Sequence, residues 1–197
     1  MVAKMTARVA TNNDTVHTAL SMWHLAGIAR EYNRSRDHMD EAGIEKVVAL
    51  LPYGSCPVPG VATAGQPDAQ AWGALARAGF KSVIDLREPD EPRGHDEPGE
   101  IALAGLAYLA LPVNHDTLGD RQFDAVRSFV GDPAHRPVLV HCATANRVGA
   151  LLLPYFALDE HMAVEEAHRL AVEVGMRSPD YSQLALDYVR RHSPTDG

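Results

Sequence analysis

One cysteine in this chain has neighbours that could make it chemically reactive. Cys142 stands between Pro137–Val140, an apolar run typical of a buried β-strand, and Val148–Leu153, an apolar run typical of a buried helix. A helix N-terminus favours an anion and lowers the pKa of a thiol placed there. Arg147 can reach back over the same loop and grip an oxyanion with its fork of donors. We therefore expect a nucleophilic thiolate and an anion clamp on one short loop.

The composition is that of a soluble globular protein. The chain has 197 residues, 46% hydrophobic and 22% charged, which suffices for one domain with a real core. A net charge of −8 argues against a general binder of nucleic acid or acidic membranes. Two cysteines, Cys56 and Cys142, indicate a reducing compartment without a disulfide framework. With no membrane-crossing stretch and no signal peptide, we expect a cytoplasmic protein.

The order of predicted elements favours an α/β fold. Strands are predicted at Val47–Leu51, Gly60–Thr63, Lys81–Leu86, Tyr108–Val113 and Pro137–Val140. Helices are predicted at 66–79, Glu100–Ala104, Asp120–Val130, Val148–Leu158, Ala163–Val174 and Tyr181–Arg191. This alternation predicts a mostly parallel central sheet with helices on both faces. Ligands of such sheets bind beyond the carboxyl ends of the strands, where Cys142 stands.

Three local features qualify this outline. Residues 1–46 are expected to be an N-terminal, helical extension that packs on the main domain, residues 47–197, or mediates self-association. Pro154 should kink its helix or end it early. The stretch Glu88–Gly99, rich in Pro, Gly and acidic residues, is expected to be a solvated loop that could border the site. The oligomeric state is left open.

Several segments carry a family resemblance when they are taken together. They are the cysteine loop His141–Arg147, the upstream Thr63–Pro67 with its Gly-Gln-Pro, the strand Val83–Arg87, and the strand end Pro112-Val113. They resemble the cysteine-based protein tyrosine and dual-specificity phosphatases. The similar branch is bacterial and comprises the phosphatase-like domain of beta-lactamase-hydrolase-like proteins and relatives fused to NAD kinase. The resemblance covers about residues 60–160 and implies a phosphatase-like fold.

This resemblance implies hydrolysis of a phosphate monoester, on a protein or a small molecule, through a phosphocysteine intermediate. Cys142 would be the nucleophile, and Arg147 would bind the oxygens of the phosphoryl group. We expect neither a metal nor a cofactor, because the ten histidines show no ligand pattern. The remaining substrate-binding residues would be the histidine that tunes the thiolate and the loop residues whose N–H groups bind oxygen: His141, Ala143, Thr144, Ala145 and Asn146.

The resemblance also implies an aspartic acid that protonates the leaving group. Asp116 follows a predicted strand end and lies 26 positions before Cys142. Asp120 is the competitor, but its place just before a helical pattern suits a helix N-cap, so we favour Asp116. Asp85 and Arg87 could line the pocket or form a structural pair.

The cysteine loop differs from the standard tyrosine phosphatase loop in three ways. Four residues instead of five separate Cys142 from Arg147, as in rhodanese-type sulfurtransferases and in this bacterial branch. Ala145 stands where a glycine is usual, and a positive φ there would cost about 1 kcal/mol or more. Val148 stands where a serine or threonine usually helps the thiolate to leave, so Thr144 would have to take that role.

These differences keep two other functions open. The compact loop suits a sulfane sulfur, so a rhodanese-like sulfurtransferase with a persulfide on Cys142 is one alternative. A catalytically weak module that binds phosphate esters is the other, and Ala145 and Val148 favour it.

Overall fold

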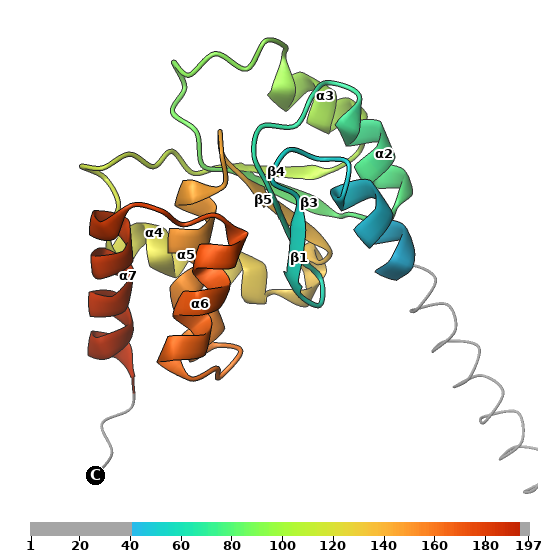
Figure 1. Cartoon of the computed structure of the whole chain (residues 1–197). Coiled ribbons are helices and arrows are strands. Elements are labelled where there is room, and N and C mark those ends of the chain that lie inside the picture. Colours follow the sequence, from blue (N-terminus) through green and yellow to red (C-terminus); the bar gives the residue numbers. More distant parts are fainter. Residues whose placement is uncertain (1–40, 194–197) are drawn as a thin grey trace, which may run out of the picture. The chain divides into compact units, whose positions relative to one another are not determined.

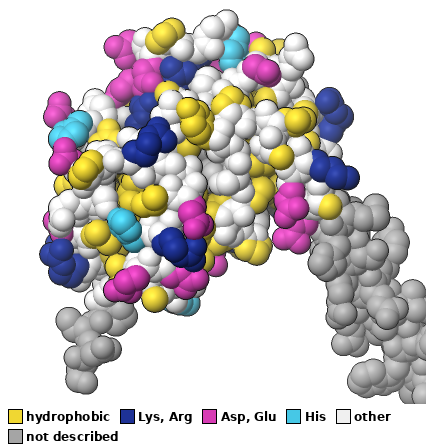
Figure 2. Space-filling model, in the orientation of Figure 1, with side chains coloured by type: hydrophobic (Ala, Val, Ile, Leu, Met, Phe, Trp, Pro, Cys, Tyr) yellow, Lys and Arg dark blue, Asp and Glu magenta, His cyan; other side chains and the backbone are white. Residues whose placement is uncertain are grey.

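The computed structural model describes residues 41–193 of the chain. The predicted helical extension up to residue 40 lies outside the described residues, and the described residues from Ala42 onward belong to one compact unit. No helix within residues 41–193 has both the length and the apolar character that a membrane span requires. On the face shown in Figure 2, acidic and basic side chains are interspersed.

Five strands form one sheet in the order β1-β2-β5-β3-β4 (Figure 1). The strands are β1 (Ser55–Val58), β2 (Val61–Ala64), β3 (Ser82–Asp85), β4 (Ala107–Ala110) and β5 (Val138–His141). Only β1 is antiparallel to its neighbour, so the sheet is mostly parallel, as predicted. The labelled helices are α2 (Ala71–Arg77), α3 (Glu97–Leu103), α4 (Asp120–Gly131), α5 (Asn146–Leu158), α6 (Val164–Val174) and α7 (Pro179–His192), and η1 (Pro133–His135) is a short 3-10 turn.

Alternation along β5 shows why helices are needed on both faces of the sheet. Val138 and Val140 point into a core shared with α4, α5, α6 and α7, whereas Leu139 points into a second core shared with α2 and α3. His141 follows the parity of Leu139, and its ring centroid lies 5.8 Å from that of Trp72 on α2. The predicted α/β class is confirmed, and residues 141 and 142 necessarily face opposite sides.

Of the two effects predicted for Pro154, a kink or an early end of its helix, the early end is wrong, because α5 continues past the proline. Pro154 removes one N–H from the helix ladder, yet the helix runs from Asn146 to Leu158. Every residue from Val148 to Phe156 is buried. Packing against α4, α6 and α7 thus stabilises a helix that intrinsic propensity alone would interrupt.

The predicted strand Val47–Leu51 is also wrong, because residues 41–48 are helical. Ile44, Val47, Val48 and Leu51 all contact the α2–α3 core, and their spacing of three, four and seven is the helical period. The short apolar run that begins at Val47 therefore continues a helix and does not form a strand.

Two boundaries upstream of the site differ from the prediction. Strand β1 was not predicted, since prolines surround it, but Pro57 is tolerated because β1 is an edge strand. Helix α2 begins at Ala71 and not at Pro67, so Gln66 and Pro67 lie outside the helix, beside the cysteine loop.

Candidate active site

The cysteine loop leaves the carboxyl end of β5 and is anchored by the end of β2. Cys142 is 1% exposed, and its N–H donates to the Ala64 carbonyl at 3.4 Å. The Gln66 N–H donates to the Ala143 carbonyl at 3.2 Å. Gly65 lies between these bonds, and a Cβ there would come within 2.9 Å of the Ala143 oxygen. The Gly-Gln-Pro segment therefore lets a second strand end press directly against the loop.

Ala145 has a left-handed backbone, which is the conformation in which an alanine at this position was expected to be strained. Its φ is +60° and its ψ is 1°, at the N-cap of α5, and the residue is completely buried. Left-handed backbone is unfavourable for a residue with a Cβ. The tight turn between the cysteine loop and α5 is therefore made by a residue with a strained backbone.

Arg147 is held by a carboxylate that sequence reasoning did not identify. Its Nη1 and Nη2 donate to the two oxygens of Glu91 at 2.5 and 2.9 Å, a bidentate ion pair. Nη1 also donates to the carbonyls of Leu86 at 3.2 Å and Val113 at 3.0 Å. These contacts fix the plane of the guanidinium before any ligand binds.

The charges at this end of the site support one another. Hydrogen bonding from Arg147 is the main reason why the pKa of Glu91 falls to about 2. Burial alone would lower the pKa of Arg147, but Glu91 and the neighbouring Cys142 raise it. Glu91 lies in the stretch that was predicted to be a solvated loop that could border the site, and this part of the stretch does border the site, through the ion pair with Arg147.

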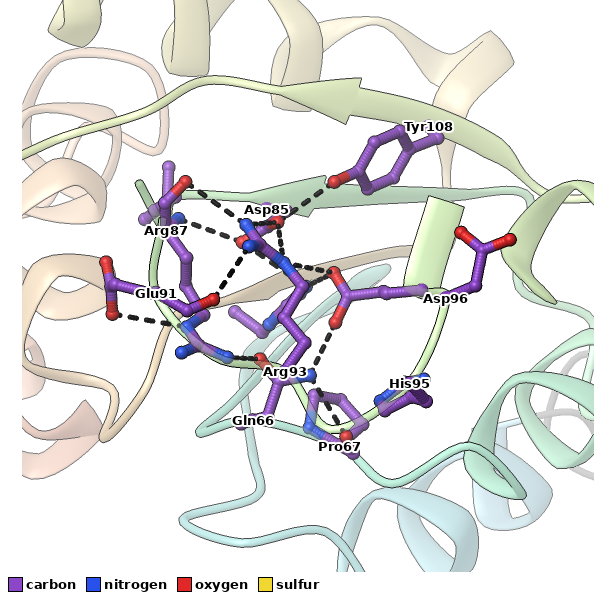
Figure 3. Close-up of polar contacts among 12 residues, drawn as sticks. Gln66, Pro67, Asp85, Arg87, Glu91, Arg93, His95, Asp96 and Tyr108 are labelled. Atoms are coloured by element: carbon purple, nitrogen blue, oxygen red, sulfur yellow. Dashed lines mark hydrogen bonds and ion pairs between the residues drawn. The ribbon is translucent and has the colours of Figure 1, made fainter. Parts of the chain in front are cut away.

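A second charge cluster, with three fully buried members, lies beside the cysteine on the α3 side of the sheet. His141 Nε2 lies 3.2 Å from Glu97 Oε1 and 3.8 Å from Asp85 Oδ1. Arg93 pairs with Asp85 at 2.6 Å and approaches Glu97 at 3.8 Å. The Tyr108 hydroxyl donates to Asp85 at 2.9 Å (Figure 3). Asp85, Glu97 and His141 each have no exposed surface.

In the described part of the chain, these three residues have ligand atoms that lie close enough together to hold a metal ion. Their ligand atoms lie within 4.8 Å of one another. The guanidinium of Arg93 already contacts both carboxylates and would repel a dication. The residues present therefore fit an ion-pair network better than a metal centre.

Gln66 and Arg87 connect the two charged regions (Figure 3). Gln66 Nε2 donates to Glu97 Oε2, and Arg87 Nη1 donates to Gln66 Oε1. Arg87 Nε donates to Glu91 Oε2 at 3.2 Å. The possible structural pair of Asp85 with Arg87 is a backbone contact, from the Arg87 N–H to Asp85 Oδ1 at 2.8 Å.

Two polar residues of the loop are engaged by the segment that leads into α7. Asn146 Oδ1 accepts from the N–H groups of Arg177 at 2.6 Å and Ser178 at 3.1 Å. Arg177 Nη2 donates to the Thr144 carbonyl at 3.2 Å and to its hydroxyl at 2.9 Å. The Asn146 side chain thus braces the loop, while Arg177, absent from the predicted site, adds a cation beside Thr144.

Asp116 lies on an exposed turn, with its side chain 97% exposed. Its N–H donates to Asn114 Oδ1 at 2.8 Å, and the adjacent His115 pairs with Asp180 at 2.9 Å. The His115 ring lies 6.0 Å from that of Tyr181. Burial raises the pKa of Tyr181; the charge of Arg147 opposes this effect, and that of Cys142 adds to it. Tyr181 therefore lies within electrostatic reach of both the turn and the cysteine loop.

The competitor Asp120 is occupied elsewhere. It is the first residue of α4, and the N-cap is Gly119, so the predicted capping role is wrong. Its two oxygens accept from Arg191 at 2.5 and 2.6 Å. This pairing lowers the pKa of Asp120, which makes it a poor proton donor.

A buried cysteine at the end of a central parallel strand, followed by a preset arginine on a buried helix, defines the architecture of cysteine-dependent phosphatases. The family model for DSP-PTPase phosphatases fused to NAD+ kinase (PTP-NADK) matches residues 60–185, and the chain belongs to this family. The family resemblance drawn from the sequence is thereby confirmed, and it favours a phosphatase over a sulfurtransferase.

Relatives and solved structures agree with this assignment. A beta-lactamase hydrolase-like protein of Xylella fastidiosa is 30% identical over 114 residues, which are 56% of this chain and 26% of that protein. The chain thus spans about a quarter of this relative. A DUF442 structure from Shewanella putrefaciens CN-32 has a TM-score of 0.66 at 19% identity, covering 76% of this chain and 99% of the other. Pseudomonas aeruginosa TpbA has a TM-score of 0.57 at 23% identity, covering 72% and 86%.

Replacing Ala145 by glycine should relieve the left-handed backbone. We expect Ala145→Gly to raise the free energy of unfolding by about 1 kcal/mol, measured by urea denaturation. Ala143→Gly is the matched control, because Ala143 is not among the residues with positive φ. It should lower stability by about 0.5–1 kcal/mol. Equal effects of the two substitutions would contradict strain at Ala145.

The Glu91–Arg147 pair should make stability depend on acid pH. Because the pKa of Glu91 falls from 4.5 to about 2 on folding, the pair stabilises the fold above about pH 4.5 and loses this effect as the pH drops towards 2. Glu91→Gln should therefore cost about 1–3 kcal/mol at neutral pH, and the difference from wild type should shrink between pH 5 and pH 3. Urea denaturation across this range measures it. Asp90→Asn is the control, because Asp90 is an exposed neighbour. A difference from wild type that shrinks with pH in the same way for Asp90→Asn would contradict the role of the Glu91–Arg147 pair.

Proposed function

We propose that the domain hydrolyses a phosphate monoester through a covalent phosphocysteine on Cys142. The observation that carries this proposal is the Arg147 guanidinium, fixed by Glu91 and two carbonyls beside a buried cysteine at a helix N-terminus. Such a guanidinium suits the oxygens of a transferring phosphoryl group, and the helix end favours the negative charge.

In the proposed first step, the Cys142 thiolate attacks phosphorus, an S–P bond forms and the bond to the leaving oxygen breaks. Arg147 and the N–H groups of residues 143–147 stabilise the charge on the three equatorial oxygens. Asp116 gives its proton to the leaving oxygen. In the second step, water attacks phosphorus, Asp116 accepts the proton of that water, and the thiolate leaves with the S–P electron pair.

The proposed substrate is a phosphate monoester on a protein or small molecule. TpbA has been solved in complex with phosphotyrosine, and SIW14 of Saccharomyces cerevisiae is a PP-IP phosphatase. Beside the loop, the guanidinium carbon of Arg177 lies 5.9 Å from the ring centroid of Tyr53, which is 58% exposed. An aromatic ring and a cation next to Thr144 suit a substrate with an apolar or anionic group near its phosphate.

We further propose a bacterial, cytoplasmic setting. The curated relatives come from Xylella and Agrobacterium, and only two cysteines occur in the sequence.

A catalytically weak phosphate-binding module is the second candidate function. The left-handed Ala145 and the fully buried Val148 favour it, because Ala145 strains the loop and Val148 offers no hydroxyl to help the thiolate leave. Saturable binding of phosphate esters without release of phosphate would support this candidate.

Replacing the nucleophile tests the proposed chemistry. We expect the wild type to release phosphate from an aryl phosphate and Cys142→Ser to lose this activity by roughly 1,000-fold or more. Cys56→Ser is the control, since Cys56 is exposed on β1, and it should retain activity. Sulfur transfer from thiosulfate to cyanide is assayed in parallel with the same proteins. Thiocyanate formation by the wild type without phosphate release would contradict the proposal.

Replacing Asp116 tests its proposed role as the general acid. Asp116→Asn should lower kcat by roughly 100-fold or more for a phosphate ester with a poor leaving group, and much less for a nitrophenyl ester, because only the poor leaving group needs the proton. Asp120→Asn should change both rates little. The assignment to Asp116 is wrong if Asp120→Asn shows the leaving-group dependence instead.

A further inference from the structure

We propose that Arg177 binds a second oxyanion of the substrate beside the cysteine loop. The preferred phosphate monoester would then carry a further phosphate or carboxylate group close to the phosphate that is transferred. This proposal rests on the proposed function of the site and narrows its substrate class. Arg177 lies in the short segment between α6 and α7.

The position of Arg177 is fixed by contacts with the cysteine loop itself. Its backbone N–H donates to Asn146 Oδ1 at 2.6 Å, and its Nη2 donates to the carbonyl and the hydroxyl of Thr144 at 3.2 and 2.9 Å. Gly175, with a φ of +137°, brings the chain so close that a Cβ there would lie 3.0 Å from the Cβ of Ala145. The segment that carries Arg177 therefore packs directly on the loop and holds the guanidinium against it.

Thr144 brings this guanidinium within reach of a substrate bound at Cys142. Only Ala143 separates Thr144 from Cys142, so the Cα atoms of these two residues lie at most about 7 Å apart. In the proposed mechanism, the N–H groups of residues 143–147 bind the oxygens of the transferring phosphoryl group. A second anionic group a few bonds from that phosphorus can therefore meet Arg177 while the first group stays in the loop.

The charge of Arg177 is not compensated by a carboxylate among the described residues. Glu173 and Asp180 are the acidic residues nearest to it in the sequence. Glu173 pairs with Arg169 at 2.7 Å, and Asp180 lies 2.9 Å from His115. An exposed cation without an acidic partner, beside a loop suited to phosphate, attracts an anion from outside the chain.

The guanidinium also keeps hydrogen-bond donors for an oxyanion. Its Nη2 is engaged by Thr144, whereas Nε and Nη1 make no hydrogen bond in the part of the chain that the structure describes. The ring of Tyr53, with its centroid 5.9 Å from the guanidinium carbon, flanks the cation without using up its donors. A planar fork with two unused nitrogens matches the paired oxygens of a phosphate or a carboxylate.

An apolar substituent at the same place would be a poorer ligand. It would remove water from the guanidinium without replacing the hydrogen bonds, which costs free energy, whereas an oxyanion supplies both charge and acceptors. Because Arg177 is exposed, solvent screens the attraction, and we expect a preference of about fivefold for the anionic substrate.

The test compares the turnover, by the full chain, of two substrates that differ in one charge. They are 3-carboxyphenyl phosphate and its neutral isostere, 3-carbamoylphenyl phosphate. We expect kcat/KM of the wild type to favour the carboxylate, and Arg177→Gln to lower the ratio of the two values about fivefold. Glutamine retains an N–H donor for Thr144, so the contact with the loop can persist while the charge is removed.

Arg77→Gln is the matched control. Arg77 is exposed on α2 and, like Arg177, has no carboxylate partner within residues 41–193, so its loss changes the net charge equally. The ratio in Arg77→Gln should equal the wild-type ratio. A ratio that falls equally in both variants would show a general effect of net charge and overturn the proposal. A ratio that is unchanged in Arg177→Gln would overturn it as well.

Binding without turnover separates this proposal from the proposed function. In Cys142→Ser protein, calorimetry measures the Kd of pyrophosphate and of inorganic phosphate, with and without Arg177→Gln. We expect Arg177→Gln to raise the Kd of pyrophosphate about fivefold more than that of phosphate. Equal effects on the two ligands would overturn the proposal. A selective effect on pyrophosphate, in a protein whose wild type releases no phosphate from either ester, would overturn the proposed function alone.

Discussion

Two carboxylates buried beside a cysteine loop need cations, and this need organises the site. The segment from Glu88 to Glu97 folds over the carboxyl edge of the sheet and inserts Arg93 between Asp85 and Glu97. The same segment places Glu91 in an ion pair with Arg147. An acidic segment that would be solvated by itself is thereby held against the protein by buried ion pairs, whose partners are costly to separate.

The sheet converts this charge arrangement into a reactive geometry. Because successive residues of a strand point to opposite faces, His141 enters the α2–α3 side with the charge cluster, while Cys142 turns towards the α5 side and its helix N-terminus. One strand end therefore places Cys142 in one environment and His141 in another. The left-handed Ala145 makes the turn from loop to helix, at a cost that the buried α5 can sustain.

Sequence alone was informative where the pattern is local. The apolar runs around Cys142 predicted β5 and α5. The missing glycine at Ala145 predicted strain on the condition of a positive φ, and the φ there is +60°. Periodicity also predicted α4, α6 and α7 within a few residues.

Pattern reasoning failed where a role depends on contacts distant in sequence. Glu91 and Glu97 have no periodic signal, and only the folded sheet shows that they meet Arg147 and His141. A Pro- and Gly-rich acidic stretch between a strand and a helix was interpreted as solvated because its composition says nothing of partners. The helix at residues 41–48 was missed for a different reason, since a five-residue apolar run fits either period.

Trapping the covalent intermediate tests the central claim most directly. The wild type is mixed with an aryl phosphate, quenched in acid within the first turnovers, digested and examined by mass spectrometry. The peptide containing Cys142 should gain the mass of one phosphoryl group, and the gain should be lost in Cys142→Ser. Phosphate release without any phosphorylated Cys142, or a phosphoryl group on another residue, would contradict a loop built to carry phosphocysteine.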